Sequence, residues 1–328
     1  MAAIQGTARA IKEGKRRTVA MFIFAVAISV FTTLVSLQWV ILKRNILSQT
    51  RQLSHGRSAD VPFVAIVSCI KSSGYRPSDG LKNYLIPSIH QTLTEDERTT
   101  YRVELILGYD EGDPYWQHRH NQLEAETIGN SGTAHPIPVS FVSIPKERHQ
   151  NENRIPFNEL CQAAYDCGAT YIVRINDDSE FKTSGWITLA IRTLLSYAPP
   201  NVGVVGPTCH QGNTEILTHD MVHAPTHYQI FDTYYPPIFD NYYIDDWMTH
   251  VYGHDRTTMI KEWEVIHHLN KYGTRYHPTF HHDSYLNETI KEGKENIRRF
   301  LLSTLTGKGD SYGGGKRLEK QRVMEQKH

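Results

Sequence analysis

The sequence predicts an α/β fold in which helices flank a mostly parallel β-sheet. From Val61 onward, short apolar runs rich in β-branched residues alternate with segments of helical periodicity. Such runs are typical of strands that are buried on both faces of a parallel sheet. Hydrophobic residues make up 39% of the 328-residue chain, which is enough for a sizeable core. Repeated β–α units of this kind indicate a sheet covered by helices on both faces.

The predicted elements follow one another closely along the chain. We expect strands at 61–70, 103–107, 139–144, 170–175 and 201–205, and helices at 81–93, 157–167 and 186–197. Gly168 follows the second of these helices, in the position of a C-cap glycine. Ligands of such sheets bind beyond the carboxyl ends of the strands. Candidate site residues are therefore expected in the segments 68–71, 110–113, 176–180 and 207–210.

A long uncharged segment precedes the first strand. Residues 18–42 carry no Asp, Glu, Lys or Arg. A helix of this length spans roughly 37 Å, against a hydrocarbon core of roughly 30 Å. We therefore expect a transmembrane helix here. A buried core helix and a cleaved signal peptide are the alternatives, and the apolar run is too long for the core of a signal peptide.

The basic residues around this segment predict its orientation. They lie slightly more densely before it than after it, which favours a cytoplasmic N-terminus and a type II signal-anchor. The expected organisation is a cytoplasmic tail at 1–17, a stem at 43–60, a lumenal catalytic domain at 61–302 and a flexible tail at 303–328. Asn287 opens the sequence Asn-Glu-Thr, a candidate N-glycosylation site. These features predict a glycoprotein of the Golgi apparatus or endoplasmic reticulum membrane.

Charge and cysteine content exclude other classes of protein. Lys+Arg and Asp+Glu both number 35, so the chain lacks the basic excess of a nucleic-acid binder. Its four cysteines are too few for a disulfide scaffold, and their spacing contains no Cys-x-x-Cys pair. That spacing argues against a zinc ribbon.

An acidic cluster directly follows the fourth predicted strand. Residues 176–180 read Asn-Asp-Asp-Ser-Glu. Carboxylates this close together repel one another unless solvent or a cation neutralises them. Their hard oxygen ligands suit Mg²⁺ or Mn²⁺. A solvated acidic turn is the alternative, but the position at the ligand-binding edge of the sheet favours a metal site.

The stretch Pro156–Phe181 (PFNELCQAAYDCGATYIVRINDDSEF) resembles the core of GT-A fold glycosyltransferases, in particular family-2-like nucleotide-diphospho-sugar transferases. The resemblance covers residues 61–282 and implies a Rossmann-like domain. In that superfamily a strand ends in a metal-binding Asp-x-Asp motif, whereas here Asn176 occupies the first place. The resemblance then implies that Asp178 is the principal ligand of Mn²⁺ (or Mg²⁺), with Asp177 or Glu180 contributing through water.

The same resemblance implies contacts to a nucleotide-sugar donor, most often linked to UDP. Asn176 and Asp177 would lie against the diphosphate, and Ser68 at the end of the first strand would also contact the donor. Asp110 would contact uracil or ribose. Arg154 is a candidate for the diphosphate or the sugar, and an exposed arginine without a ligand is its alternative.

A second acidic pair, Asp245-Asp246-Trp247, resembles the pair that opens a helix in inverting GT-A enzymes. A hydroxyl is a poor nucleophile until a base removes its proton. We expect Asp246 to be that base and Asp245 to cap the helix or contact the acceptor, while simple N-capping is the alternative. The resemblance also implies a histidine metal ligand. His277 is the expected ligand, with His281 and the weaker His254 as alternatives.

These expectations describe a metal-dependent enzyme that transfers a sugar to a hydroxyl of a glycan or glycoprotein acceptor, with inversion. A non-catalytic sugar- or partner-binding module is the alternative, and Asn176 gives it weight. A nucleotidylyltransferase would carry a Gly-rich basic loop after the first strand, and residues 68–74 match that poorly. A phosphoesterase would need two converging carboxylate sets.

Overall fold

The computed structural model describes residues 61–73, 79–131, 136–145, 154–211, 213–269, 271, 276–277 and 283–306. The predicted transmembrane segment 18–42, the flanking segments 1–17 and 43–60, and residues 307–328 of the predicted tail lie outside these ranges. Within the described part of the chain, no helix combines the length and the apolar character needed to cross a membrane.

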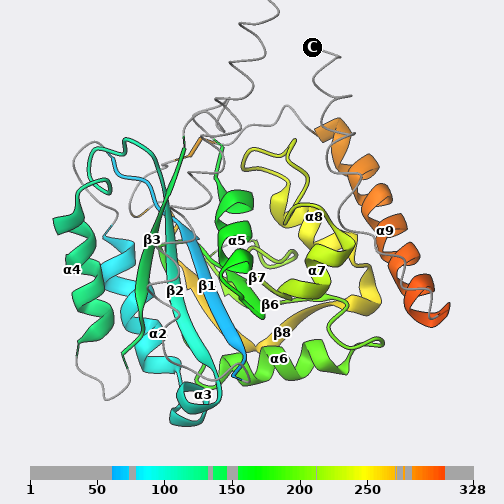
Figure 1. Ribbon diagram of the computed structural model, residues 1–328, viewed down its shortest axis with the longest axis horizontal. Coiled ribbons are helices and arrows are strands. Elements are labelled where there is room, and N and C mark those ends of the chain that lie inside the picture. The colour runs from blue at the N-terminus through cyan, green and yellow to red at the C-terminus, as the bar shows by residue number, and fades with distance from the viewer. Residues whose placement is uncertain are drawn as a thin grey trace, which may run out of the picture. The chain divides into compact units, whose positions relative to one another are not determined.

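One eight-stranded sheet forms the centre of the domain (Figure 1), with the strand order β3-β2-β1-β4-β7-β6-β8-β5. The strands are β1 (Phe63–Cys69), β2 (Arg102–Asp110), β3 (Val139–Ile144), β4 (Tyr171–Arg174), β5 (Ser179–Phe181), β6 (Val204–His210), β7 (Asp220–His223) and β8 (Thr257–His267). The helices are η1 (Leu81–Leu85), α2 (Ile86–Thr92), α3 (Glu95–Thr100), α4 (Arg119–Asn130), α5 (Phe157–Asp166), α6 (Trp186–Ser196), α7 (Ala224–Ile230), α8 (Ile244–Val251), η3 (His254–Arg256) and α9 (Asp283–Thr306).

The sheet is mixed but mostly parallel, since only β7 and β5 run against the other strands. Strands β3, β2, β1 and β4 pair in parallel, as predicted. Strand β7 then pairs antiparallel with both β4 and β6, and β6 pairs in parallel with β8. Because both pairings of β7 are antiparallel, β6 runs in the same direction as β4. The carboxyl ends of β4, β6 and β8 therefore lie at the same edge of the sheet as those of β1 and β2.

The fifth predicted strand lies further along the chain than expected. Strand β6 begins at Val204 and runs to His210, so the predicted loop 207–210 belongs to the strand itself. The register between β6 and β8 shifts between Pro207 and Thr208. A proline cannot donate a backbone hydrogen bond to a neighbouring strand, which is why such irregularities accompany it.

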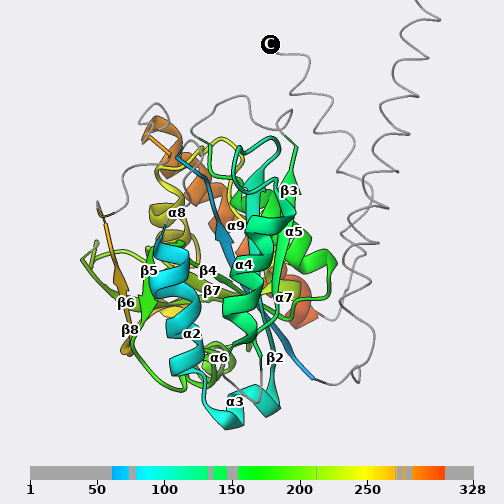
Figure 2. The same ribbon diagram turned by 90° about the vertical axis from the view of Figure 1, so that its left-hand side faces the viewer.

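Alternating side chains of β1 divide the core between the two faces of the sheet. Val64 and Ile66 pack against η1, α2, α4 and α6 on one face. Ala65 and Val67 pack against α5, α7, α8 and α9 on the other. The two views separate these groups of helices, with α2 and α4 nearest the viewer in Figure 2 and α8 and α9 on the far side. Burial on both faces explains why β1 is apolar without interruption.

Candidate functional site

A pocket opens at the carboxyl ends of β1, β4 and β8. Its volume is about 140 Å³. It is lined by Cys69, Ile155, Phe157, Asn176, Asp177, Asp178, His267 and Tyr276. Three of the predicted donor and metal residues therefore share one pocket, together with a histidine that the sequence did not single out.

The segment Asn176–Asp178 is fixed by close backbone packing. Asp177 and Asp178 are only 1% and 8% exposed. Gly80, which precedes η1, lies against them so closely that a Cβ at this position would be 2.8 Å from Asp178 Cα. Only glycine permits such an approach of two backbone segments. The carboxylates are thus held at the sheet edge by the start of the first helical segment.

His267, the last residue of β8, faces the acidic segment. Its Nε2 lies 3.1 Å from Asp178 Oδ1 and 3.2 Å from Asn176 Nδ2. Sequence reasoning missed this residue because it did not predict β8. The sequence offered only a weak signal for it, an interrupted apolar pattern over 257–267 followed by the pair His267-His268.

The remaining acidic residue of the cluster points elsewhere. Glu180 forms an ion pair with Lys182 at 3.0 Å and a hydrogen bond with His268 Nε2 at 3.0 Å. The pocket therefore has Asp177 and Asp178 as its carboxylates, while Glu180 is satisfied by these two partners.

A second and larger cavity, of about 490 Å³, opens at the start of α8. It is lined by Asn213, Ile216, Thr218, Asn241, Tyr242, Tyr243, Asp245 and Asp246. Both predicted catalytic carboxylates lie here. The helix is preceded by Tyr243 in a left-handed conformation (φ 67°), with no side-chain cap. Asp245 and Asp246 occupy its first turn, where the helix dipole favours negative charge, but neither is an N-cap.

Asp245, which is 34% exposed, belongs to an ionic network with the buried residues Arg174 and Asp220. Arg174, the last residue of β4, donates to Asp245 Oδ1 at 2.8 Å and to Asp220 Oδ2 at 2.7 Å. Tyr234 Oη donates to the other oxygen of Asp220. Since Arg174 stands two residues before Asn176, one strand end connects the acidic pocket with the carboxylates of α8.

The charges of this network shift the pKa values of its members. The pKa of the Asp245 carboxyl is raised, because desolvation and the charges of Asp220 and Asp246 together outweigh the lowering by Arg174. Burial opposes the charge of Arg174, but Asp220 and Asp245 together outweigh it, so the pKa of Arg174 lies above its usual value. The guanidinium therefore stays charged and restrains Asp245. No ion pair involves Asp246 within the described residues, and its carboxylate faces the cavity.

The other predicted donor contacts lie in different settings. Ser68 is fully buried in β1 and is not among the residues that line the pocket, whereas its neighbour Cys69 is. Asp110 is the last residue of β2. Arg154 precedes the pocket-lining Ile155 and pairs with Glu159 at 3.1 Å.

Neither of the two predicted histidines that the structure describes lines the pocket. His277 is exposed, and its backbone carbonyl accepts a hydrogen bond from Asn241 at 2.7 Å. His254 is fully exposed as the first residue of η3. His281 lies outside the described residues. The histidine that lies beside Asp178 in this structure is His267.

No protein-family model matches this sequence, and no curated protein matches it either. Similar solved structures include Staphylococcus aureus TarS 1–349 in complex with UDP-GlcNAc, with a TM-score of 0.44 and 11% identity over 75% of this chain and 72% of that one. Another is TarS 1–349 alone, with a TM-score of 0.41 and 11% identity over 63% of this chain and 60% of that one. The chain covers 44% of the longer TarS chain. Similarity at this level assigns neither a family nor an activity, so the function has to be inferred from this chain's own residues.

Proposed function

We propose that this protein is a metal-dependent glycosyltransferase that moves a sugar from a nucleotide-diphosphate sugar to an acceptor hydroxyl, with inversion. One observation carries the proposal. An acidic pocket with a facing histidine lies at the ligand-binding edge of the sheet, and Arg174, two residues before the pocket-lining Asn176, pairs with Asp245 of a cavity that two further carboxylates line. The acidic pocket suits a cation and the diphosphate of the donor, and the larger cavity suits the acceptor.

The residues of the pocket fit a divalent cation. Asp178 offers a carboxylate and His267 an imidazole nitrogen 3.1 Å away. Carboxylates suit Mg²⁺ and Mn²⁺, and the nitrogen ligand favours the softer Mn²⁺ of the two. When bound, the cation would neutralise the negative charge that develops on the departing nucleoside diphosphate.

Asn176 is compatible with this proposal but does not favour it over a non-catalytic module. Its side-chain amide lies 3.2 Å from His267 Nε2, the same ring nitrogen that lies beside Asp178. This contact holds the ring next to Asp178, and Nε2 has to exchange it for the cation when the metal binds. The asparagine therefore leaves room for the site without supporting it.

The carboxylates of α8 supply the acceptor chemistry in this proposal. Asp246 takes the proton from the acceptor hydroxyl, and Arg174 holds the neighbouring Asp245 in place to orient the acceptor. A base on the acceptor side and a leaving group on the other allow a single displacement, which inverts the anomeric carbon. Within the same proposal, Asp110 and Arg154 serve the nucleoside and the diphosphate, and UDP is the carrier to test first.

The test combines metal binding with a donor screen. Replacing Asp178 by asparagine should weaken Mn²⁺ binding by at least roughly 10–100-fold. Mutation of a residue that only hydrogen-bonds to a metal ligand already weakens metal binding by that factor. Mn²⁺ titration followed by electron paramagnetic resonance measures this. Asp255→Asn, at a side chain that is 91% exposed, is the matched control. Mn²⁺ and UDP binding without transfer or hydrolysis of any nucleotide-sugar would instead favour the non-catalytic module.

We further propose that the domain works in the lumen of the Golgi apparatus or endoplasmic reticulum, anchored by residues 18–42. Asn287 of the sequon is exposed on α9, which supports its use. Protein made in a secretory host should lose mass on treatment with an N-glycosidase, and Asn287→Gln should abolish that loss. An unmodified wild-type protein would remove the support that the sequon gives to a lumenal location.

A further inference from the structure

A group of soft metal ligands lies behind the acidic pocket. Cys209 in β6, His219 before β7 and His267 at the end of β8 each place a ligand atom within 4.8 Å of the other two. Cys209 is a free thiol with no exposed surface, and His219 is 1% exposed. The rings of His219 and His267 lie with their centroids 5.3 Å apart. No other group of this kind occurs in the described residues.

His219 has one ring nitrogen that the surrounding protein leaves unsatisfied. Its Nε2 lies 3.1 Å from Ser179 Oγ, whereas its Nδ1 is buried and has no hydrogen-bond partner among the described residues. A buried polar atom without a partner is destabilising. Nδ1 is therefore the nitrogen through which this ring is available to a ligand.

We propose that Cys209, His219 and His267 form a binding site for a soft divalent cation of the Zn²⁺ class. One thiolate and two imidazoles match the ligand preference of Zn²⁺, and three protein ligands leave a fourth tetrahedral position for water. Cys209 gives up its proton to solvent when the metal–sulfur bond forms. Ser179, bonded to the other nitrogen of His219, orients that ring as an outer-shell partner.

The ligands would have to move closer together to bind a metal. Zn–S and Zn–N bonds of about 2.3 and 2.1 Å at tetrahedral angles place two ligand atoms about 3.4–3.6 Å apart. The present separations of up to 4.8 Å are longer than that by about 1 Å. Binding therefore requires the two histidine rings to turn toward the sulfur of Cys209.

Occupation of this site also affects the acidic pocket, because His267 belongs to both. Its Nε2 now lies beside Asp178 and Asn176. A cation held by Cys209 and His219 recruits the same imidazole and draws it away from Asp178. Zn²⁺ therefore antagonises the Mn²⁺-dependent transfer. This consequence rests on the proposed function, whereas metal binding by the three residues does not.

Titration of the full-length chain with Co²⁺, a spectroscopic substitute for Zn²⁺, tests the site directly. One equivalent should produce a near-ultraviolet charge-transfer band from a thiolate to cobalt, and Zn²⁺ should abolish the band by competition. Cys209→Ser should remove the band and weaken Zn²⁺ binding by more than about 100-fold. This exceeds the loss of about 10–100-fold that mutation of an outer-shell partner causes. Cys161→Ser, at another fully buried free thiol in α5, should change neither.

A second variant separates loss of a ligand from loss of the fold. His219→Gln leaves Cys209, His267 and Asp178 in place, so it should weaken the band and Zn²⁺ binding while circular dichroism stays unchanged. Wild-type protein without the band, or a band that survives Cys209→Ser, would overturn the site. A band without inhibition of transfer by Zn²⁺ would overturn only the sharing of His267. A band in a protein that transfers no sugar would reject the proposed function but keep the metal site.

Discussion

Replacing Asp246 by asparagine is expected to lower the rate of sugar transfer by about 10²–10⁴-fold, the usual contribution of a positioned general base. The asparagine keeps the size of the side chain but cannot accept the proton of the acceptor hydroxyl. Binding of Mn²⁺ and of the nucleoside diphosphate should stay unchanged, because Asp246 lines the cavity beside α8 and not the acidic pocket. Initial rates of transfer and binding titrations measure the two effects separately.

Asp255→Asn is again the matched control, since Asp255 is exposed on η3. Its rate should equal that of the wild type. A rate for Asp246→Asn within a few-fold of the control would remove Asp246 from the role of base. A product with retained anomeric configuration, determined by nuclear magnetic resonance of the linkage, would do the same by a different route.

The elements that the sequence predicted correctly are those with strong local signals. The expected strand at 139–144 and helix at 157–167 correspond to β3 and α5 within one residue. Gly168 adopts a positive φ of 89° after α5, which confirms the C-cap. Each of these segments combines an apolar pattern with a clear start or stop signal, so neighbouring residues determine it.

The second half of the sheet was not predictable in the same way. In β8 the charged residues Lys261, Glu262 and Glu264 interrupt the apolar pattern, because one side of this strand is exposed. Strands β5 and β7 have three and four residues, too few for a periodic pattern. The insertion of β7 between β4 and β6 makes the sheet mixed, and only long-range pairing determines that position.

The predictable part of the candidate site is likewise the part with local signals. A strand end marks Asn176–Asp178, and a helix start marks Asp245–Asp246. His267 was missed because its strand was missed. Arg174 pairs with Asp220 and Asp245, which lie 46 and 71 positions further along the chain. No local pattern in the sequence indicates such contacts.

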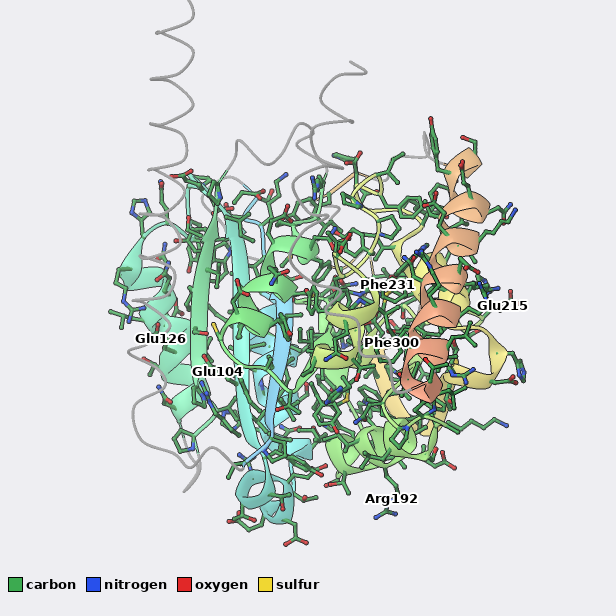
Figure 3. The ribbon with its side chains drawn as sticks, turned by 45° about the vertical axis from the view of Figure 1, so that its right-hand side comes forward. Glu104, Glu126, Arg192, Glu215, Phe231 and Phe300 are labelled. Atoms are coloured by element: carbon green, nitrogen blue, oxygen red, sulfur yellow. The ribbon has the colours of Figure 1, made fainter. Side chains whose placement is uncertain are left out.

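Arg174→Met is expected to lower the free energy of unfolding by about 3–5 kcal/mol, the cost of removing one partner from a buried ion pair. Asp220 has no exposed side-chain surface, so its charge would remain buried without a cation. Urea denaturation measures the change. Arg192→Met is the control, since Arg192 extends from α6 into solvent (Figure 3). A loss for Arg174→Met within about 1 kcal/mol of the control, the worth of a surface pair, would contradict a buried network.

The double variant Arg174→Met with Asp220→Asn decides whether the cost comes from the stranded charge. The asparagine removes the charge of Asp220 and still accepts the hydrogen bond from Tyr234 Oη. The double variant should therefore be more stable than Arg174→Met alone, with a coupling of about 0.5–3 kcal/mol, as expected for residues in one network. Additive effects would show that Arg174 acts mainly by filling space. Because Asp245 also loses its partner in both variants, transfer should stay impaired after stability recovers, which separates the positioning of Asp245 from the stability of the fold.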